Sequence, residues 1–144
     1  MKQVLNKSLR LGNTDVALVF IRVTIALLML THGLPKLGLF ISDEPIVFAS
    51  VFGMSQSVSI GFTVFAEVFC PILILVGLGT RFAAIPLIFT MAVAVFYIHS
   101  ADPFSIKEMA ALYLLGFTFL FITGGGKYSL DNIIRTRFLN PVYA

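Results

Sequence analysis

Four long apolar runs, each bounded by charged or turn-forming residues, constrain this chain more than any other feature. A helix that crosses the hydrocarbon core of a bilayer needs about 20 mostly apolar residues. Of 144 residues, 58% are hydrophobic and 12% are charged, whereas soluble domains average about 45–50% and about 25%. So small a globule cannot bury that much apolar surface. The sequence therefore predicts an all-α integral membrane four-helix bundle, forming one domain over residues 1–144, with spanning helices at residues 15–34, 57–79, 82–99 and 106–123.

The longest connection separates the first spanning helix from the second. Gly33 and Pro35 predict the end of the first helix. Further along, the segment Ser42-Asp43-Glu44-Pro45 is typical of a helix start and precedes the apolar residues 46–52. This pattern favours a short helix between the two spans that is interfacial or partly re-entrant. The alternative is a loop whose aromatic side chains touch lipid headgroups.

The basic residues are distributed unequally between the two sides of the membrane. Lys36 and Lys107 fall on the side opposite the N-terminus. Seven others fall on the N-terminal side, namely Lys2, Lys7, Arg10, Arg81, Lys127, Arg135 and Arg137. Because cytoplasmic loops carry an excess of Lys and Arg, we expect both termini, including a tail over residues 124–144, to be cytoplasmic. The net charge of +3 is thus explained by basic residues that orient the chain in the membrane, and nucleic acid is not an expected partner.

Ionisable residues inside or next to the apolar runs are the candidates for function. They are Arg22, His32, Lys36, Glu67, His99, Lys107 and Glu108. A charge at the bilayer centre costs about 2.5–3.5 kcal/mol on insertion scales, so such residues normally face the bundle interior and pair with one another.

Helical rise places several of these residues at one depth. At 1.5 Å per residue, His32, His99 and Glu108 lie roughly 25 Å from the cytoplasmic ends of their helices. Glu67 lies about one turn below that layer, at roughly 20 Å, and Lys36 one turn above His32. Four helices thus each contribute an ionisable group to the same region, and this coincidence is the strongest functional indication in the sequence.

Pro71 adds a backbone feature at Glu67. A proline has no N–H to donate to the carbonyl four residues earlier, which here is that of Glu67. Membrane proteins commonly build polar cavities on such interrupted turns, although the same pattern is also typical of a packing kink.

Structural roles are open for the same residues. Arg22, roughly 10 Å deep, can extend to the cytoplasmic interface or pair with Glu67. His32 and His99 can bond headgroups or loop carbonyls. Two histidines and two carboxylates could hold a metal, but the sequence lacks HxxxH and ExxH spacing, so no metal is expected.

These residues sit in motifs that resemble those of the DoxX family of small bacterial membrane proteins. The resemblance covers about residues 16–134. Its motifs are His32-Gly33-Leu34-Pro35-Lys36, Glu67, Gly77-Leu78-Gly79-Thr80-Arg81-Phe82-Ala83-Ala84, Glu108 and Gly124-Gly125-Gly126-Lys127-Tyr128-Ser129-Leu130-Asp131. It implies a four-helix bundle in the bacterial inner membrane. It also implies a link to membrane redox chemistry, since relatives include the membrane subunit of thiosulfate:quinone oxidoreductases.

The leading hypothesis is therefore a quinone-linked subunit of a membrane oxidoreductase. Its electron donor is another protein or a small molecule, and a soluble or membrane-bound redox protein is the expected partner. Glu67 and Glu108 would carry protons as the catalytic groups. His32 and His99 would hydrogen-bond the quinone carbonyls, and Lys36 or Arg22 would stabilise negative charge. The isoprenoid tail would lie along a lining formed by Phe65, Phe69, Phe89 and Phe96.

Two other classes of function fit the same sequence. A non-catalytic scaffold would anchor soluble redox or stress enzymes on the basic residues Arg81, Lys127, Arg135 and Arg137. A carrier for protons or small solutes would need a water path past Glu67, and a unit of four helices would have to form a homo-oligomer to provide one. Membrane lipids are expected partners in every case.

Overall fold

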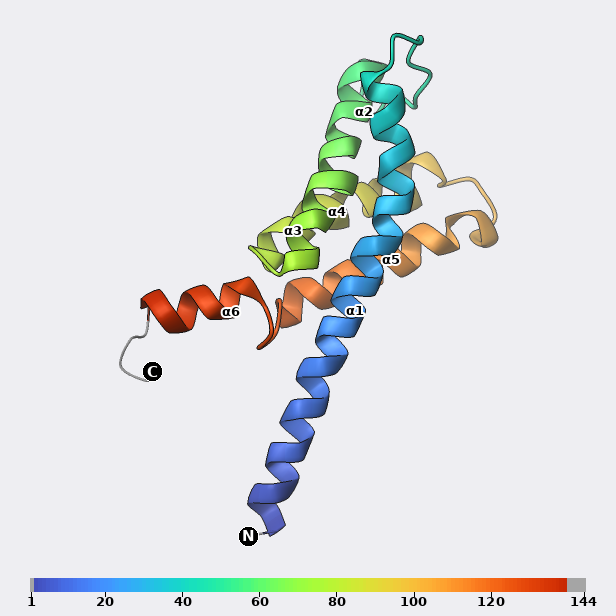
Figure 1. Cartoon of the computed structure of the whole chain (residues 1–144). Helices are drawn as coiled ribbons and strands as arrows, with labels where there is room; N and C mark the ends of the chain where they lie inside the picture. The colour runs from blue at the N-terminus through green and yellow to red at the C-terminus, as the bar shows by residue number, and fades with distance from the viewer. Residues whose placement is uncertain (1, 140–144) are drawn as a thin grey trace.

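The computed structural model describes residues 2–139 of the chain and the side chains of residues 14–137 (Figure 1). Within that part the chain is helical and has no strand. The elements are α1 (Lys2–Ile41), α2 (Gln56–Val64), the π-helical segment η1 (Phe65–Phe69), α3 (Cys70–Val76), α4 (Thr80–Val93), η2 (Ala94–Ile98), α5 (Phe104–Thr123), α6 (Leu130–Ile134) and η3 (Arg135–Leu139).

Four helical stretches of the described chain are long and apolar enough to cross a membrane. They are Thr14–Ile41, Gln56–Val76, Thr80–Ile98 and Phe104–Thr123. The second is the continuous rod of α2, η1 and α3, and the third is α4 with η2. The predicted all-α fold with four spanning helices is confirmed.

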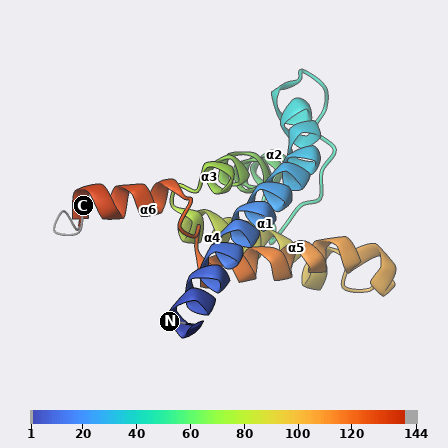
Figure 2. The same ribbon diagram turned by 60° about the horizontal axis from the view of Figure 1, so that its bottom comes forward.

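The bundle is built from two packed pairs that share a core. α1 packs along α2, η1 and α3, while α4 packs along α5. Small side chains such as Ala26 and Ala84 let the helices approach, and larger ones such as Leu87 and Phe117 fill the space between them, all at 0% exposure. Figure 2 shows α6 running sideways from the end of the bundle where α3 meets α4.

The outer faces of the helices are apolar as well. Phe82 is 81% exposed and Phe96 is 71% exposed. In the most apolar window of α5 only 11% of residues are buried. Large apolar side chains turned outward on every spanning helix are compatible with lipid and not with water, as expected where the bilayer is the solvent.

The first helix differs from the prediction at both ends. It begins at Lys2 and continues through Gly33 and Pro35 to Ile41, whereas the sequence predicted residues 15–34. A proline is tolerated inside a membrane helix where packing and nearby groups compensate for the lost bond. The side chains of Lys2, Lys7 and Arg10, used to predict orientation, lie outside the described part, as do tail residues 140–144.

The short helix predicted between the first two spans is not formed. Residues 42–55 contain bends and one turn but no helix. Ile46 and Phe48 instead pack against the Ile60 cluster of α2, and the Val51 N–H donates to Ser59 Oγ at 3.2 Å. Tertiary contacts with α2 therefore hold this segment as a folded-back loop. We call this side of the molecule the loop end.

The opposite side, which we call the glycine-rich end, contains the turn from α3 to α4 and residues 124–129. Gly77 ends α3 with a φ of 74°, and the Leu78 N–H donates to the Leu73 carbonyl at 2.9 Å. This left-handed C-cap is a conformation that glycine adopts without steric cost. The carboxylate of Asp131 accepts hydrogen bonds from the Gly79 and Thr80 N–H groups, at 2.6 and 3.0 Å, so α6 is fastened to the start of α4.

The closest approach between α1 and the second span occurs at Gly33. A β-carbon at this position would lie 2.3 Å from the Glu67 carbonyl oxygen and 2.7 Å from its carbonyl carbon. These are backbone atoms, which cannot rotate away as the end of a side chain could. Gly33 is therefore required for the packing of α1 on η1, and it is not a helix terminator as the sequence suggested.

We expect Gly33→Ala to destabilise the bundle by about 1–3 kcal/mol, the usual cost of overpacking a close contact. Gly38→Ala is the matched control, because a β-carbon on Gly38, also in α1, would meet nothing within 4 Å. Thermal unfolding of the two variants in mild detergent measures the difference. Equal melting temperatures would contradict the close approach.

Candidate functional site

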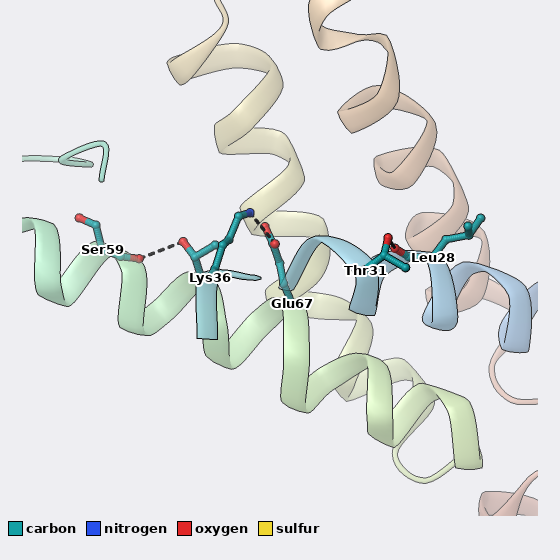
Figure 3. A network of polar contacts seen from close by, with 6 residues as sticks. Leu28, Thr31, Lys36, Ser59 and Glu67 are labelled. Carbon is teal, nitrogen blue, oxygen red and sulfur yellow. Dashed lines mark hydrogen bonds and ion pairs between the residues drawn. The ribbon is translucent and has the colours of Figure 1, made fainter. Parts of the chain in front are cut away.

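A half-buried ion pair links α1 to the π-helical segment of the second span. Lys36 Nζ lies 2.5 Å from Glu67 Oε2 (Figure 3). The Glu67 side chain is 3% exposed and that of Lys36 is 32% exposed. The lysine thus reaches inward from the loop end to neutralise a carboxylate that has almost no contact with solvent or lipid, as intramembrane charges require.

Pro71 explains why the helix widens at Glu67. In a regular α-helix the proline ring would press on the Glu67 carbonyl and would offer it no N–H. The chain instead forms a π-turn over Phe65–Phe69, in which the Cys70 N–H donates to the Phe65 carbonyl. Such π-turns are frequent at functional sites. The interrupted turn expected at Glu67 is present, and Gly33 of α1 lies against the Glu67 carbonyl.

The ion pair borders a cavity of about 240 Å³ between α1, η1, α4, η2 and α5. His32, His99 and Tyr113 contribute its other polar side chains, and Met29, Met91 and Met109 part of its apolar wall. The rings of His32 and Tyr113 meet edge to face, with centroids 5.6 Å apart and planes at 82°. The cavity therefore combines a charged pair, two imidazoles and a phenol with polarizable methionine walls.

His99 is held at the edge of this cavity by its position at the end of η2. Its N–H donates to the Ala94 carbonyl at 3.0 Å, which ends the π-turn. Its ring Nδ1 lies 2.7 Å from Asp102 Oδ2. The carboxylate orients the imidazole and leaves Nε2 for another partner.

Two further cavities continue from the first. One of about 230 Å³ shares Lys36, Glu67, Ala94 and His99 with it. A third, of about 460 Å³, shares Val51, Thr63, Thr90 and Val93 with the second and is lined mostly by apolar side chains, Phe65 and Phe89 among them. A polar compartment thus leads into an apolar one.

The structure brings together four of the six predicted site residues: Lys36, Glu67, His32 and His99 all line the first cavity. Glu108 does not join them. It is exposed on the first turns of α5 and is absent from the lining of either cavity beside the ion pair. Its neighbours Ile106 and Met109 line the first cavity, so Glu108 lies at the level of that cavity, but the packing of α5 turns its side chain elsewhere.

Arg22, the sixth, lies at the glycine-rich end and is 4% exposed. Its Nη1 donates to the Gly125 carbonyl at 2.7 Å and its Nη2 to the Tyr128 carbonyl at 3.2 Å. Its hydrogen bonds therefore hold the loop after α5, and the suggested pairing with Glu67 is not made.

Sequence reasoning overlooked two residues and misplaced part of the aromatic lining. These residues are Tyr113, a phenol inside the fourth apolar run, and Asp102, three residues after His99. Each is a polar residue at the depth of the expected site, so both could have been predicted as site residues. Of the predicted lining, Phe65 and Phe89 border the apolar cavity, and Phe69 and Phe96 border none of the three cavities described. Among the described residues, no group of three or more His, Cys, Asp and Glu could hold a metal.

Removing one partner of the ion pair should have unequal effects. We expect Lys36→Met to cost about 3 kcal/mol or more, because it leaves Glu67 buried without its counter-charge. Glu67→Gln should cost on the order of 1 kcal/mol, since the partly exposed lysine can reach the interface.

Thermal unfolding in detergent measures both effects, and Lys107→Met controls for the loss of a lysine at the same end of the bundle. The Lys107 ammonium only donates to the Ser100 carbonyl, at 3.1 Å. A smaller cost for Lys36→Met than for Glu67→Gln would contradict the assignment of Glu67 as the enclosed charge.

Comparison with known proteins shows the family of this chain. The family model described as DoxX matches residues 17–100, a stretch that includes His32, Lys36, Glu67 and His99. An uncharacterized protein of Haemophilus influenzae is 31% identical over 122 residues, which cover 80% of this chain and 88% of the relative. No solved structure matches the chain. With four apolar helices and a family match over more than half its length, this multi-pass membrane chain belongs to the DoxX family.

Proposed function

We propose that the chain is the quinone-binding membrane subunit of an oxidoreductase system in the bacterial inner membrane. The observation that carries the proposal is the Lys36–Glu67 pair, half-buried beside a cavity that His32, His99 and Tyr113 also line. Polar groups that converge on a mostly apolar cavity are the usual marks of a ligand site. An electron donor would be a separate protein, consistent with the lack of a cysteine pair in this sequence.

The shape of the cavities fits a ligand with a small polar ring and a long apolar tail. The compartments of about 240 and 230 Å³ beside the ion pair suit a ring with oxygen substituents. The adjoining compartment of about 460 Å³ has an apolar lining, which suits an isoprenoid chain. Small ligand pockets usually measure about 300–1,000 Å³, so the three together are large enough.

When bound, a quinone supplies two-electron chemistry that is coupled to proton uptake. For that chemistry the chain's own residues would provide donors and a proton. His32 and Tyr113 would donate hydrogen bonds to the ring oxygens, and His99, whose Nδ1–H faces Asp102, would accept one at Nε2 from a hydroxyl of the reduced ring. The Glu67 carboxylate would accept a proton and pass it to the reduced ring, and Lys36 would stabilise negative charge on the ligand. Glu108 remains a predicted second proton carrier, and its exposed position makes it the weaker candidate.

The orientation proposed for this function has the glycine-rich end in the cytoplasm. Arg81, Lys127 and Arg135 surround one cavity at that end, while Lys36 and Lys107 belong to the loop end. This distribution follows the rule that basic residues favour the cytoplasmic side. The quinone site would then open toward the outer half of the membrane.

Mass spectrometry of lipid extracts tests the proposal on protein purified in mild detergent. We expect the wild type to retain quinone at about one per chain, and Glu67→Gln to lose most of it while remaining folded. Glu108→Gln is the matched control, since it neutralises a glutamate at the same end outside the cavity, and it should retain quinone.

Two results would count against a quinone site. No enrichment of quinone in the wild type over bulk membrane lipid would favour the scaffold function, in which the ion pair only stabilises the bundle. Equal loss in both glutamate variants would contradict the assignment of the site to the Lys36–Glu67 cavity.

A further inference from the structure

The largest cavity described lies at the glycine-rich end, away from the ion pair. It measures about 640 Å³. Two spanning helices end at it, because Arg81 and Thr123 line it and lie at or next to the ends of the spans Thr80–Ile98 and Phe104–Thr123, and Asp15 of α1 lines it as well. The ends of spanning helices lie at the depth of lipid headgroups, so this cavity opens where the phosphates of the membrane are.

Cations dominate the accessible part of the lining. Arg81, Lys127 and Arg135 are all exposed. Arg81 is positioned by its hydrogen bond to the Ile122 carbonyl, at 3.0 Å, and Arg135 by one to Asn132 Oδ1, at 3.1 Å. Each uses one guanidinium nitrogen in these bonds, so other N–H groups remain to bind an anion.

The two carboxylates of the lining are already engaged by the protein. Asp131 accepts from the Gly79 and Thr80 N–H groups and lies near the positive charge of Arg22. Asp15 accepts a long bond of 3.4 Å from the Lys127 N–H. Three cations and two carboxylates therefore line the cavity, and since Arg22 offsets Asp131, the cavity keeps an excess of positive charge.

Apolar surface continues the site toward the membrane. Leu18 and Phe82 line the cavity on the side of the spans, and Phe82 is 81% exposed. Beside the cavity, α6 and η3 run sideways from the bundle (Figure 2), with Ile133 and Ile134 exposed at 45% and 41%. A short helix that carries both exposed isoleucines and arginines is typical of an element lying in the membrane interface.

We propose that this cavity binds the phosphate of an anionic phospholipid. Arg81, Lys127 and Arg135 hold the headgroup, and an acyl chain descends along Leu18 and Phe82. A free phosphate ion would match the cations but not the apolar wall, and an acidic protein surface would not use the depth of the cavity. Basic pockets at the ends of membrane helices are known binding sites for anionic lipids.

Native mass spectrometry from detergent containing equal amounts of phosphatidylglycerol and phosphatidylethanolamine tests the proposal. We expect the wild type to retain phosphatidylglycerol in preference. Changing Arg81, Lys127 and Arg135 together to Gln should reduce that retention more than tenfold, since each interfacial cation is worth about fivefold in anionic-lipid binding. Lys107→Gln, which removes a cation at the loop end, should leave retention unchanged.

Several results would overturn the proposal. One is equal binding of the two lipids by the wild-type protein. The three cations would then be better explained as a binding surface for an acidic partner protein. Another is a triple variant that is folded by circular dichroism and still retains phosphatidylglycerol. Thermal stabilisation by inorganic phosphate as large as that by phosphatidylglycerol would assign the site to a free anion. If the triple variant does not fold, the single variant Lys127→Gln replaces it in the same competition between the two lipids. Lys127 is exposed and its side chain is not needed for packing, so this variant should fold and retain less phosphatidylglycerol than the wild type.

Discussion

The crossing of α1 over the π-helical segment of the second span is the contact on which the site depends. Pro71 cannot bond the Glu67 carbonyl, and the widened turn leaves that carbonyl turned toward α1, where only a glycine fits against it. Weak Cα–H···O contacts at such close helix crossings stabilise membrane bundles. Lys36 lies about one turn after Gly33 in α1. Because Gly33 permits the close approach of the two helices, the Lys36 side chain can reach the Glu67 carboxylate.

The polar side chains of the interior are divided between the two ends of the bundle. At the glycine-rich end, Arg22 and Asp131 bond backbone groups of loops and helix ends, and they fasten α6 and the turn after α3 to the spans. At the loop end, the Lys36–Glu67 pair borders open cavities. The first group satisfies backbone atoms that would otherwise be buried without partners. The second leaves polar atoms facing space that a ligand can occupy.

Prediction from the sequence was most reliable where hydrophobicity alone decides the outcome. The four spans follow from the length of their apolar runs. The same reasoning ended the first helix at Gly33 and Pro35, because both residues interrupt helices in water. In the bundle, Gly33 provides close packing and α1 continues to Ile41. Residues 42–52 had the pattern of a helix start, but contacts of Ile46 and Phe48 with α2 hold them as a loop.

The four-helix membrane fold, the interrupted turn at Glu67 and the relative heights of the ionisable residues along their helices could be predicted from the sequence, because length, proline chemistry and helical rise are local properties. Which of those residues meet was decided only by the tertiary structure. Depth does not specify the direction of a side chain around its helix, and that direction depends on packing against neighbours. For this reason Lys36, His32, His99 and Tyr113 line the cavity beside Glu67, whereas Glu108 lines neither cavity beside the ion pair and Arg22 bonds loop carbonyls at the opposite end.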